Sequence, residues 1–296
     1  MRASSLPRLA FAGIGLMGLP MCQRLLAAGY PLVVWNRNPD KCAPLVALGA
    51  QQVFERAELC AQADIIMLCL ADTQAVFEVM FAEQGIAAAM HKEQILVDFS
   101  SIEPATTRGM AQQLAQSCGA QWLDVPVSGG VGGAEAGSLA MMAGGDADAL
   151  AQVMPVLAHL SQRVTHMGPV GSGQVTKVCN QMLVACNAMV IAEVVALAEQ
   201  AGVDASLLAP ALAGGFADSK PLQILAPQMA EREFEPVKWH VRTLLKDLDM
   251  AVQLSHSHLS ATPMSGLAAQ LMRSHGAQGY LAADPATLIK LYSGDK

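Results

Sequence analysis

The first half of the chain alternates short, continuous apolar runs with longer runs in which apolar residues recur every three or four positions. Continuous apolar runs are typical of strands buried on both faces of a parallel sheet, and the recurring pattern is typical of helices. The alternation predicts right-handed strand–helix–strand crossovers and a doubly wound sheet. The predicted strands are Leu9–Ala12, Leu32–Trp35, Ile65–Leu70, Ile95–Phe99, Trp122–Val125, Ser138–Met142 and Val164–His166.

The pattern changes after Gly168, where strand-like runs disappear and helical periodicity continues to the end. Gly171-Ser172-Gly173 begins a predicted helix that runs to about Ala201, where Gly202 offers a stop. At ~1.5 Å per residue this helix is roughly 40 Å long, which is enough to join two domains. The helices predicted before it are Leu19–Ala28, Lys41–Leu48, Gln74–Met80, Thr106–Ser117 and Ala147–Leu160.

These patterns predict an α/β protein of two domains. The first, residues 1–168, is a Rossmann domain with a doubly wound parallel sheet. The second, residues 169–296, is an all-α domain, connected to the first by the long interdomain helix.

Composition excludes several classes of protein. Of the 296 residues, 53% are hydrophobic and 15% are charged, which argues against disorder. A net charge of −7 gives no basic surface for nucleic acid or an anionic membrane. The seven cysteines are odd in number and form no C-x-x-C pair, so we expect reduced thiols in a cytoplasmic protein and no metal.

Two segments bear on membrane targeting. Residues Met1–Arg8 are short and polar and lead into a strand, so we expect no signal peptide. The most apolar stretch, Val175–Leu197, contains Lys177, Asn180 and Glu193. These polar residues favour a buried helix over a membrane span.

A glycine motif follows the first predicted strand and opens the first predicted helix. Its residues are Gly13, Ile14, Gly15, Leu16, Met17 and Gly18. In such a motif the first glycine permits a tight turn, the second lets the backbone approach a pyrophosphate, and the third lets helix and strand pack closely. Free N–H groups at the helix start then face the phosphates. The motif predicts a dinucleotide site.

The end of the second strand bears on the choice of dinucleotide. An Asp or Glu near this point accepts a hydrogen bond from the ribose 2′-hydroxyl of NAD. Position 36 is Asn, so no carboxylate repels a 2′-phosphate, and Arg37 can pair with one. We expect NADP(H) to be preferred, with NAD(H) as the alternative. The competing interpretation is that Arg37 is a solvated surface residue.

Two later segments carry candidate chemistry. Ser128, Gly129 and Gly130 follow a strand and offer a hydroxyl and unhindered N–H groups to a carboxylate, although a plain glycine turn has the same sequence. Lys177 lies near the start of an otherwise apolar helix, with Asn180 one turn further along. A lysine there can give a proton to a carbonyl oxygen and take it back. By spacing alone, a surface lysine is the commoner outcome.

The sequence resembles the β-hydroxyacid dehydrogenase family over almost its whole length. Within that family it is most similar to the tartronate semialdehyde reductases, although Asn36 and Arg242 depart from their usual acidic residues. The matching segments occur in the same order as in the family. They are Phe11–Gly18, Asp98–Ser101, Asp124–Gly130, Gly171–Gln181 and Lys246–Leu248.

The resemblance implies a role for each matching residue. It implies that Lys177 is the catalytic proton carrier, and that Ser128, Gly129, Gly130 and Asn180 contact a small carboxylate-bearing substrate. It implies that Ser101 and Lys246 lie at the cofactor, and that the backbone of Leu70 and Ala71 passes the adenosine side. The family often has proline at position 71. The resemblance also implies a Rossmann domain followed by a helical domain, in homodimers or homotetramers.

Two other functions remain open at this point. Imine reductases share the fold and the nucleotide motif, but usually have another residue in place of the lysine that matches Lys177. A non-catalytic nucleotide-binding module is the second alternative, and Lys177 also argues against it. Arg242 is either a surface charge or a source of positive potential near an acidic substrate.

Overall fold

The computed structural model describes residues 6–292. The expectation about a signal peptide therefore falls partly outside the described residues. The chain divides into two compact units, Met1–Lys177 and Val178–Lys296. The boundary between the units lies inside helix α8 (Ser172–Gln200), whose first two turns belong to the first unit.

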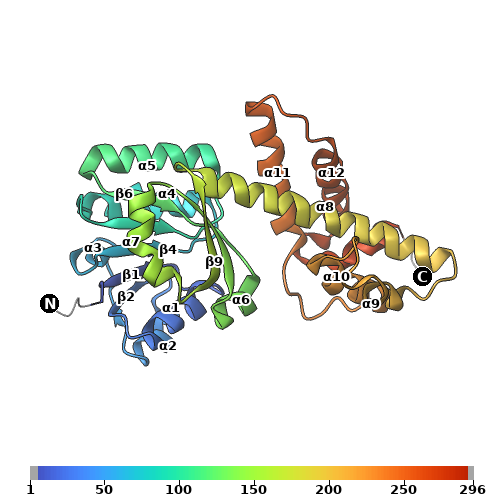
Figure 1. Cartoon of the computed structure of the whole chain (residues 1–296), viewed down its shortest axis with the longest axis horizontal. Helices are drawn as coiled ribbons and strands as arrows, with labels where there is room; N and C mark the ends of the chain where they lie inside the picture. The colour runs from blue at the N-terminus through green and yellow to red at the C-terminus, as the bar shows by residue number, and fades with distance from the viewer. Residues whose placement is uncertain (1–5, 293–296) are drawn as a thin grey trace. The chain divides into compact units, whose positions relative to one another are not determined.

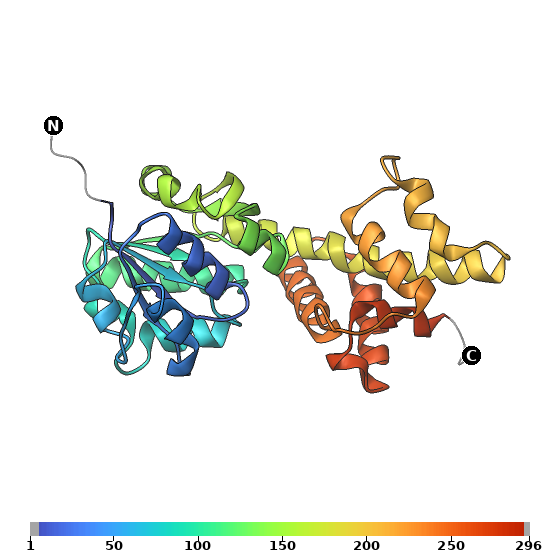
Figure 2. The same ribbon diagram turned by 90° about the horizontal axis from the view of Figure 1, so that it is seen from below.

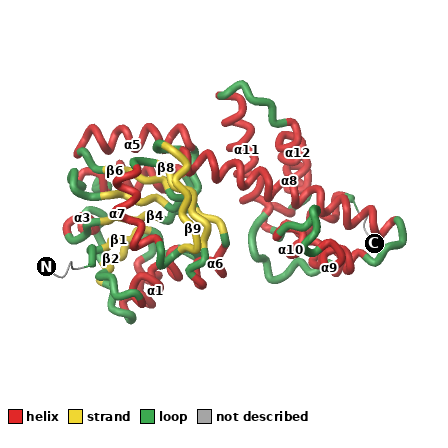
Figure 3. Tube along the Cα trace, in the orientation of Figure 1, coloured by secondary structure: helices red, strands yellow, loops and turns green. Residues whose placement is uncertain are grey.

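The first unit contains the sheet, drawn in yellow in Figure 3. The spatial order of its strands is β3-β2-β1-β4-β5-β6-β8-β7, with β9 paired to β8. Strands β1 to β6 are all parallel to one another, as predicted for a doubly wound sheet. Their bounds are β1 Leu9–Ala12, β2 Leu32–Trp35, β3 Gln51–Gln52, β4 Ile65–Leu68, β5 Ile95–Asp98 and β6 Gln121–Asp124.

The sheet ends in a mixed extension, whose last two strands the sequence predicted, but not the short strand before them or the antiparallel pairing. Strand β8 (Leu139–Gly144) runs antiparallel to β6 and to the short β7 (Val127–Ser128). Strand β9 (Ser161–Gly168) returns parallel to β8. The chain can reverse here because β6 and β8 are connected by a short loop and helix α6 (Gly130–Ala136), without a crossover to the parallel direction.

Alternate residues of the central strands enter two separate cores. Leu9 and Phe11 of β1 lie in the core on one face, together with Met21 and Leu25 of helix α1. Ala10 and Ala12 lie in the core on the other face, which helices α3, α4 and α5 cover. Both faces of the parallel sheet are therefore buried, which explains the continuous apolar runs. Figure 1 shows α1 and α5 on opposite faces.

The helices of the first unit besides α8 lie between the strands. Pro39 starts a single 3₁₀ turn, Pro39–Cys42, that breaks the helix predicted over Lys41–Leu48. The α-helices are α1 Gly18–Ala27, α2 Ala43–Val46, α3 Glu58–Ala61, α4 Thr73–Phe81, α5 Pro104–Cys118, α6 Gly130–Ala136 and α7 Ala147–Leu157.

The second unit consists of helices and connecting loops throughout its described part, as Figure 2 shows. Its core is formed by alanines of α8, such as Ala188 and Ala192, packed against Leu225, Leu248 and Met272. Small residues on one helix let the others approach closely. The helices after α8 are α9 Leu208–Leu212, α10 Lys220–Glu231, α11 Val241–Ser257 and α12 Pro263–Ala277.

Helix α8 is, within residues 6–292, the one helix that is long and apolar enough to cross a membrane. Its most apolar stretch has a mean hydropathy of 1.9, and 39% of that stretch is buried. Ala185, Ala188, Ala192 and Val195 are buried in the core of the second unit. These four residues pack one face of α8 against the core of the second unit.

Candidate active site

The carboxyl ends of the central strands meet in register at one edge of the sheet. Ala12 pairs with Leu68, Leu68 with Asp98, and Asp98 with Asp124. Ligands of open α/β sheets bind outside this edge. The loops that leave it carry most of the residues selected from the sequence.

The glycine loop follows β1 at this edge. Gly13 has a φ of 104°, and a Cβ there would lie 2.3 Å from the carbonyl oxygen of Cys69. A Cβ at Gly18 would lie 2.0 Å from the carbonyl oxygen of Gly13. At Gly15, by contrast, no described atom lies within 4 Å of such a Cβ. Gly13 and Gly18 are therefore needed for packing, whereas Gly15 faces open space.

The open space at Gly15 fits a bound dinucleotide. Helix α1 begins at Gly18, so its unpaired N–H groups point toward the same loop. Leu16 is 82% exposed, so its side chain leaves the approach to the backbone open. The N–H groups of Gly13 and Ile14 are bonded to Trp35 and Asn36, so the backbone N–H groups of residues 15–18 would hold the pyrophosphate of NAD(P).

Asn36 shapes the glycine loop from the end of β2. Its Oδ1 accepts a hydrogen bond from the N–H of Ile14 at 2.9 Å, and its Nδ2 donates to the carbonyl oxygen of Asn38 at 2.8 Å. The neutral amide of Asn36 thus pairs with a backbone N–H of the glycine loop and adds no negative charge there. Arg37 is exposed beside it and forms no ion pair among residues 6–292.

The loops after β4 and β5 are tied to each other. The hydroxyl of Ser100 accepts a hydrogen bond from the N–H of Leu70 at 2.9 Å. Ser100 is buried, whereas its neighbour Ser101 is half-buried and Ala71 is exposed. Of the candidate residues in these two loops, Ser101 and Ala71 can be reached from solvent. Leu70 lies just beyond β4, which ends at Leu68 and not at Leu70 as predicted.

Asp98, the last residue of β5, is a buried carboxyl at the same edge. Its Oδ1 accepts a hydrogen bond from the N–H of Ser100 at 2.9 Å, while Oδ2 has no hydrogen-bond partner among residues 6–292. Burial raises the pKa of Asp98 to about 7, against the effect of the Ser100 hydrogen bonds.

The segment after β6 carries the candidate carboxylate-binding residues. Ser128 ends the short strand β7 and is half-buried, and Gly129 and Gly130 are exposed. Gly129 and Gly130 have φ values of 140° and 63°, a region that favours glycine. Helix α6 begins at Gly130, so its first N–H groups add to those of the glycines.

Lys177 stands within the first two turns of α8, about 8 Å along the axis from the helix start. It is half-buried. The helix start is attached to the sheet by Asp124, the last residue of β6, which accepts hydrogen bonds from the N–H groups of Gly171 and Gln174. Burial raises the pKa of Asp124, and the backbone hydrogen bonds oppose the rise. Sequence reasoning selected neither Asp124 nor Gln174.

The second unit holds the remaining candidates, Asn180 and Lys246, in one group joined by hydrogen bonds and an ion pair. Asn180 Nδ2 donates to Gln181 Oε1 at 2.8 Å, and Gln181 Nε2 donates to Asp247 Oδ2. Lys246 Nζ lies 3.4 Å from Asp247 Oδ1. Asp247 is buried and so fixes one residue on α8 and one on α11. Arg242 is exposed one turn before Lys246.

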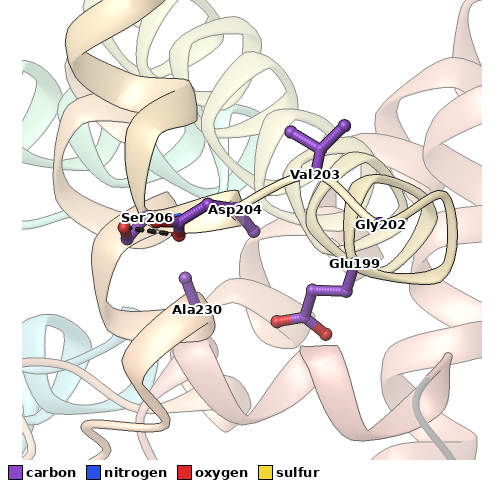
Figure 4. Close-up of a pocket in the computed structure, with 7 residues that line it drawn as sticks. Glu199, Gly202, Val203, Asp204, Ser206 and Ala230 are labelled. Atoms are coloured by element: carbon purple, nitrogen blue, oxygen red, sulfur yellow. Dashed lines mark hydrogen bonds between the residues drawn. The ribbon is translucent and has the colours of Figure 1, made fainter.

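A surface hollow in the second unit lies apart from these residues (Figure 4). Its volume is about 470 Å³. Glu199 is paired with Arg232 at 2.8 Å, and Asp204 Oδ1 accepts hydrogen bonds from the backbone and hydroxyl of Ser206. Glu199 and one carboxylate oxygen of Asp204 thus already have partners. The hollow is lined by Glu199, Gly202, Val203, Asp204, Ala205, Ser206 and Ala230.

Models of known protein families match both units of the chain. Residues 8–168 match the family model of the NAD-binding domain of 6-phosphogluconate dehydrogenase. Residues 171–292 match the model described as the NAD-binding region of NADP-dependent 3-hydroxyisobutyrate dehydrogenase.

Individual relatives match over nearly their full length. The chain is 35% identical to 2-hydroxy-3-oxopropionate reductase of Escherichia coli, over 96% of each chain. It is 33% identical to an NAD-dependent L-serine dehydrogenase of Pseudomonas aeruginosa, over 96% of this chain and 97% of that one. A solved structure of Mycobacterium tuberculosis 3-hydroxyisobutyrate dehydrogenase with L-serine superposes with a TM-score of 0.86 at 28% identity, over 96% of this chain and 98% of that one.

The matched domains and relatives agree with the fold and with the order of the motifs. The NAD(P)-binding edge of the sheet is present in the first unit, and the helical second unit is of the kind found in these dehydrogenases. The chain therefore belongs to the 3-hydroxyisobutyrate dehydrogenase branch of the β-hydroxyacid dehydrogenase family, a family of NAD(P)-dependent oxidoreductases.

Proposed function

We propose that the chain interconverts a small β-hydroxyacid and its semialdehyde, with 2-hydroxy-3-oxopropionate (tartronate semialdehyde) as the leading substrate. The observation that carries the proposal is the place of Lys177. It stands near the start of a helix that Asp124 attaches to the carboxyl edge of the sheet, where the glycine loop also lies. The 35% identity to 2-hydroxy-3-oxopropionate reductase supports the choice of substrate.

In this proposal Lys177 carries the proton of the reaction. When bound, the reduced nicotinamide supplies the hydride to the carbonyl carbon. As that bond forms, the carbonyl π electrons move to oxygen, and the Lys177 ammonium gives this oxygen a proton. The neutral lysine then regains a proton from solvent. In the oxidation direction, neutral Lys177 removes the hydroxyl proton of the hydroxyacid.

The substrate carboxylate is held by the segment after β6. Ser128 offers a hydroxyl, and exposed Gly129 and Gly130 offer backbone N–H groups at the start of α6. Hydrogen bonds from neutral donors to a carboxylate are stronger than those to a neutral acceptor. Asn180 would bind a substrate oxygen, since its amide is held by Gln181.

NADP(H) is the proposed cofactor. Exposed Arg37, without an ion-pair partner among residues 6–292, and uncharged Asn36 support binding of a 2′-phosphate. We expect Arg37→Ser to lower the ratio of kcat/KM for NADPH to that for NADH by about 10-fold, the loss of one charge-assisted bond. Wild-type efficiency with NADH equal to or above that with NADPH would contradict the preference.

We also propose that the protein forms homodimers or homotetramers. Helix α8 has a stripe of exposed apolar side chains at spacings of three, four and seven residues, formed by Leu183, Val190, Val194 and Leu197. Large exposed apolar patches mark interaction surfaces. Light scattering of the purified protein should give a mass of at least two chains, and Leu183→Glu should lower it. A wild-type monomer at micromolar concentration would contradict this.

The substrate is tested by a panel followed at 340 nm, in which the aldehydes and the imine are reduced with NADPH or NADH and the hydroxyacids are oxidised with NADP+ or NAD+. The panel contains tartronate semialdehyde, glyoxylate, succinic semialdehyde, 3-hydroxyisobutyrate, L-serine, threonate and a cyclic imine. We expect the highest kcat/KM with tartronate semialdehyde. Turnover of the cyclic imine alone would instead identify an imine reductase. Tight NADPH binding without turnover of any member would favour a nucleotide-binding module.

A further inference from the structure

The start of helix α8 is capped by a carboxylate from a distant strand. Asp124 is fully buried at the end of β6. Its Oδ1 accepts the N–H of Gly171 at 2.7 Å, and its Oδ2 accepts the N–H of Gln174 at 2.8 Å. A local helix cap such as Asp146 binds only the N–H groups two and three residues later. Asp124 instead connects segments that are 47 and 50 residues apart.

Gln174 connects the same helical turn to the loop after β5. Its side chain is fully buried. Nε2 donates to the carbonyl oxygen of Ser100 at 2.7 Å, and Oε1 accepts the N–H of Ile102 at 3.1 Å. These two bonds lie on either side of Ser101, a candidate cofactor residue. The turn of α8 is thus bonded to two loops of the sheet edge.

The packing at this junction leaves no room for movement toward the sheet. A Cβ at Gly173 would lie 2.4 Å from the carbonyl oxygen of Met142 and 2.5 Å from that of Asp124. A Cβ at Gly144 would lie 2.5 Å from Asp124 Oδ1. Glycine at both positions lets the helix start lie directly on the backbone of β6 and β8.

Lys177 follows Gln174 by three residues, so the two side chains project from neighbouring positions of one helix face. Any shift or tilt of the first turn therefore moves Lys177. We propose that Asp124 and Gln174 are positioning residues, which fix the start of α8 so that Lys177 stands at a set place beside the Ser100–Ile102 loop. This inference rests on the proposed function, in which Lys177 carries the proton.

The expected effect is a loss of rate rather than of cofactor binding. A misplacement of about 1 Å of a reacting group can lower a rate by about 100-fold. Asp124→Asn keeps the size of the side chain but replaces one acceptor oxygen by a donor that faces a backbone N–H. We expect it to lower kcat by about 10- to 100-fold, while the Kd for NADPH stays within about 3-fold of wild type.

A double-mutant cycle separates positioning from general damage. In wild type, Asp124→Asn should lower kcat as stated; in a Lys177→Ala background, it should change the residual kcat by less than about 3-fold, because the group it positions is gone. Asp146→Ala is the matched control, since it removes both hydrogen bonds of the α7 cap, which reach only Asp148 and Ala149, and it should leave kcat unchanged. The substrate is the panel member that wild type turns over fastest.

A second readout does not depend on activity. Backbone hydrogen exchange of the peptide that contains residues 171–177 should become faster in cofactor-free Asp124→Asn than in wild type, and should stay unchanged in Asp146→Ala. If Asp124→Asn does not fold, Gln174→Met takes its place in the same cycle and the same exchange measurement, because it removes both Gln174 hydrogen bonds at similar volume.

The outcomes distinguish the two proposals. If Lys177→Ala lowers kcat, but Asp124→Asn lowers the residual kcat of that variant as much as it lowers the kcat of wild type, the positioning role alone is overturned. Wild-type kcat in folded Asp124→Asn, with unchanged exchange, would do the same. Wild-type kcat in Lys177→Ala would overturn both the proposed function and this inference.

Discussion

The open space above Gly15 leads to a variant that separates folding from cofactor binding. In Gly15→Ala the added Cβ meets no described atom within 4 Å, and the backbone at this position is outside the left-handed region. The substitution therefore costs no packing, and it reduces the freedom of the unfolded chain. We expect the free energy of unfolding to change by no more than about 1 kcal/mol, in the stabilising direction.

The same methyl group would occupy the space through which a pyrophosphate approaches the loop. Loss of one charge-assisted hydrogen bond costs about 1.5–3 kcal/mol, which corresponds to a roughly 10- to 150-fold rise in the Kd for NADPH. Fluorescence titration with NADPH measures the Kd, and a thermal melt of the apo protein measures stability.

Two glycine variants serve as controls. Gly18→Ala places a Cβ 2.0 Å from the carbonyl oxygen of Gly13, so it should lose stability strongly. Gly109→Ala lies on the exposed side of α5 with nothing within 4 Å, so it should gain roughly 0.5–1 kcal/mol and leave the Kd unchanged. Wild-type affinity in a stable Gly15→Ala protein would refute the position assigned to the pyrophosphate.

Two further predictions concern the pH dependence of stability. Asp98 has a pKa of about 7 in the folded protein and near 3.8 in the unfolded chain. Between pH 4 and 7 the carboxyl therefore ionises in the unfolded chain but stays protonated in the folded protein. This lowers the free energy of unfolding increasingly as pH rises, by at most roughly 4 kcal/mol. In thermal melts the stability of Asp98→Asn relative to wild type should therefore rise over this range, and a constant difference would contradict the buried carboxyl. Burial, and then the charge of Lys290, lowers the pKa of His275 to about 4. Between pH 6.5 and 4 the unfolded chain therefore binds a proton at His275 that the folded protein does not bind, so the stability contributed by the neutral imidazole is lost as pH falls. His275→Gln should be less stable than wild type at pH 7 and lose this deficit by pH 4, whereas a deficit independent of pH would show that His275 does not titrate as described.

Much of the fold could be predicted because it follows from local patterns. The first two strands were predicted with their observed bounds, since continuous apolar runs on both faces of a parallel sheet are unambiguous. Strand β9 was predicted too short because most of its side chains are exposed and give no apolar run. Helix α6, Gly130–Ala136, was missed because its four residues Gly130 to Gly133 include three glycines, which are weak helix formers.

The site could be predicted only in part, for a different reason. Residues that contact ligands through motifs, such as the glycine loop and Lys177, leave a spacing that can be recognised. Asp124 and Gln174 act on partners 47 to 74 residues away, and no spacing reveals these. A signal was present, however: Asp98 and Asp124 each end an otherwise apolar strand, and a carboxyl buried there requires partners.

The role of Lys177 as the proton carrier is tested by Lys177→Ala. NADPH titration and tartronate semialdehyde reduction should be measured on the same preparation. Lys238→Ala, which removes an exposed lysine from a loop of the second unit, serves as a surface control. We expect a kcat about 10²- to 10⁴-fold below wild type in Lys177→Ala, with the Kd for NADPH within about 3-fold of wild type. A kcat near the wild-type value with intact NADPH binding would contradict it.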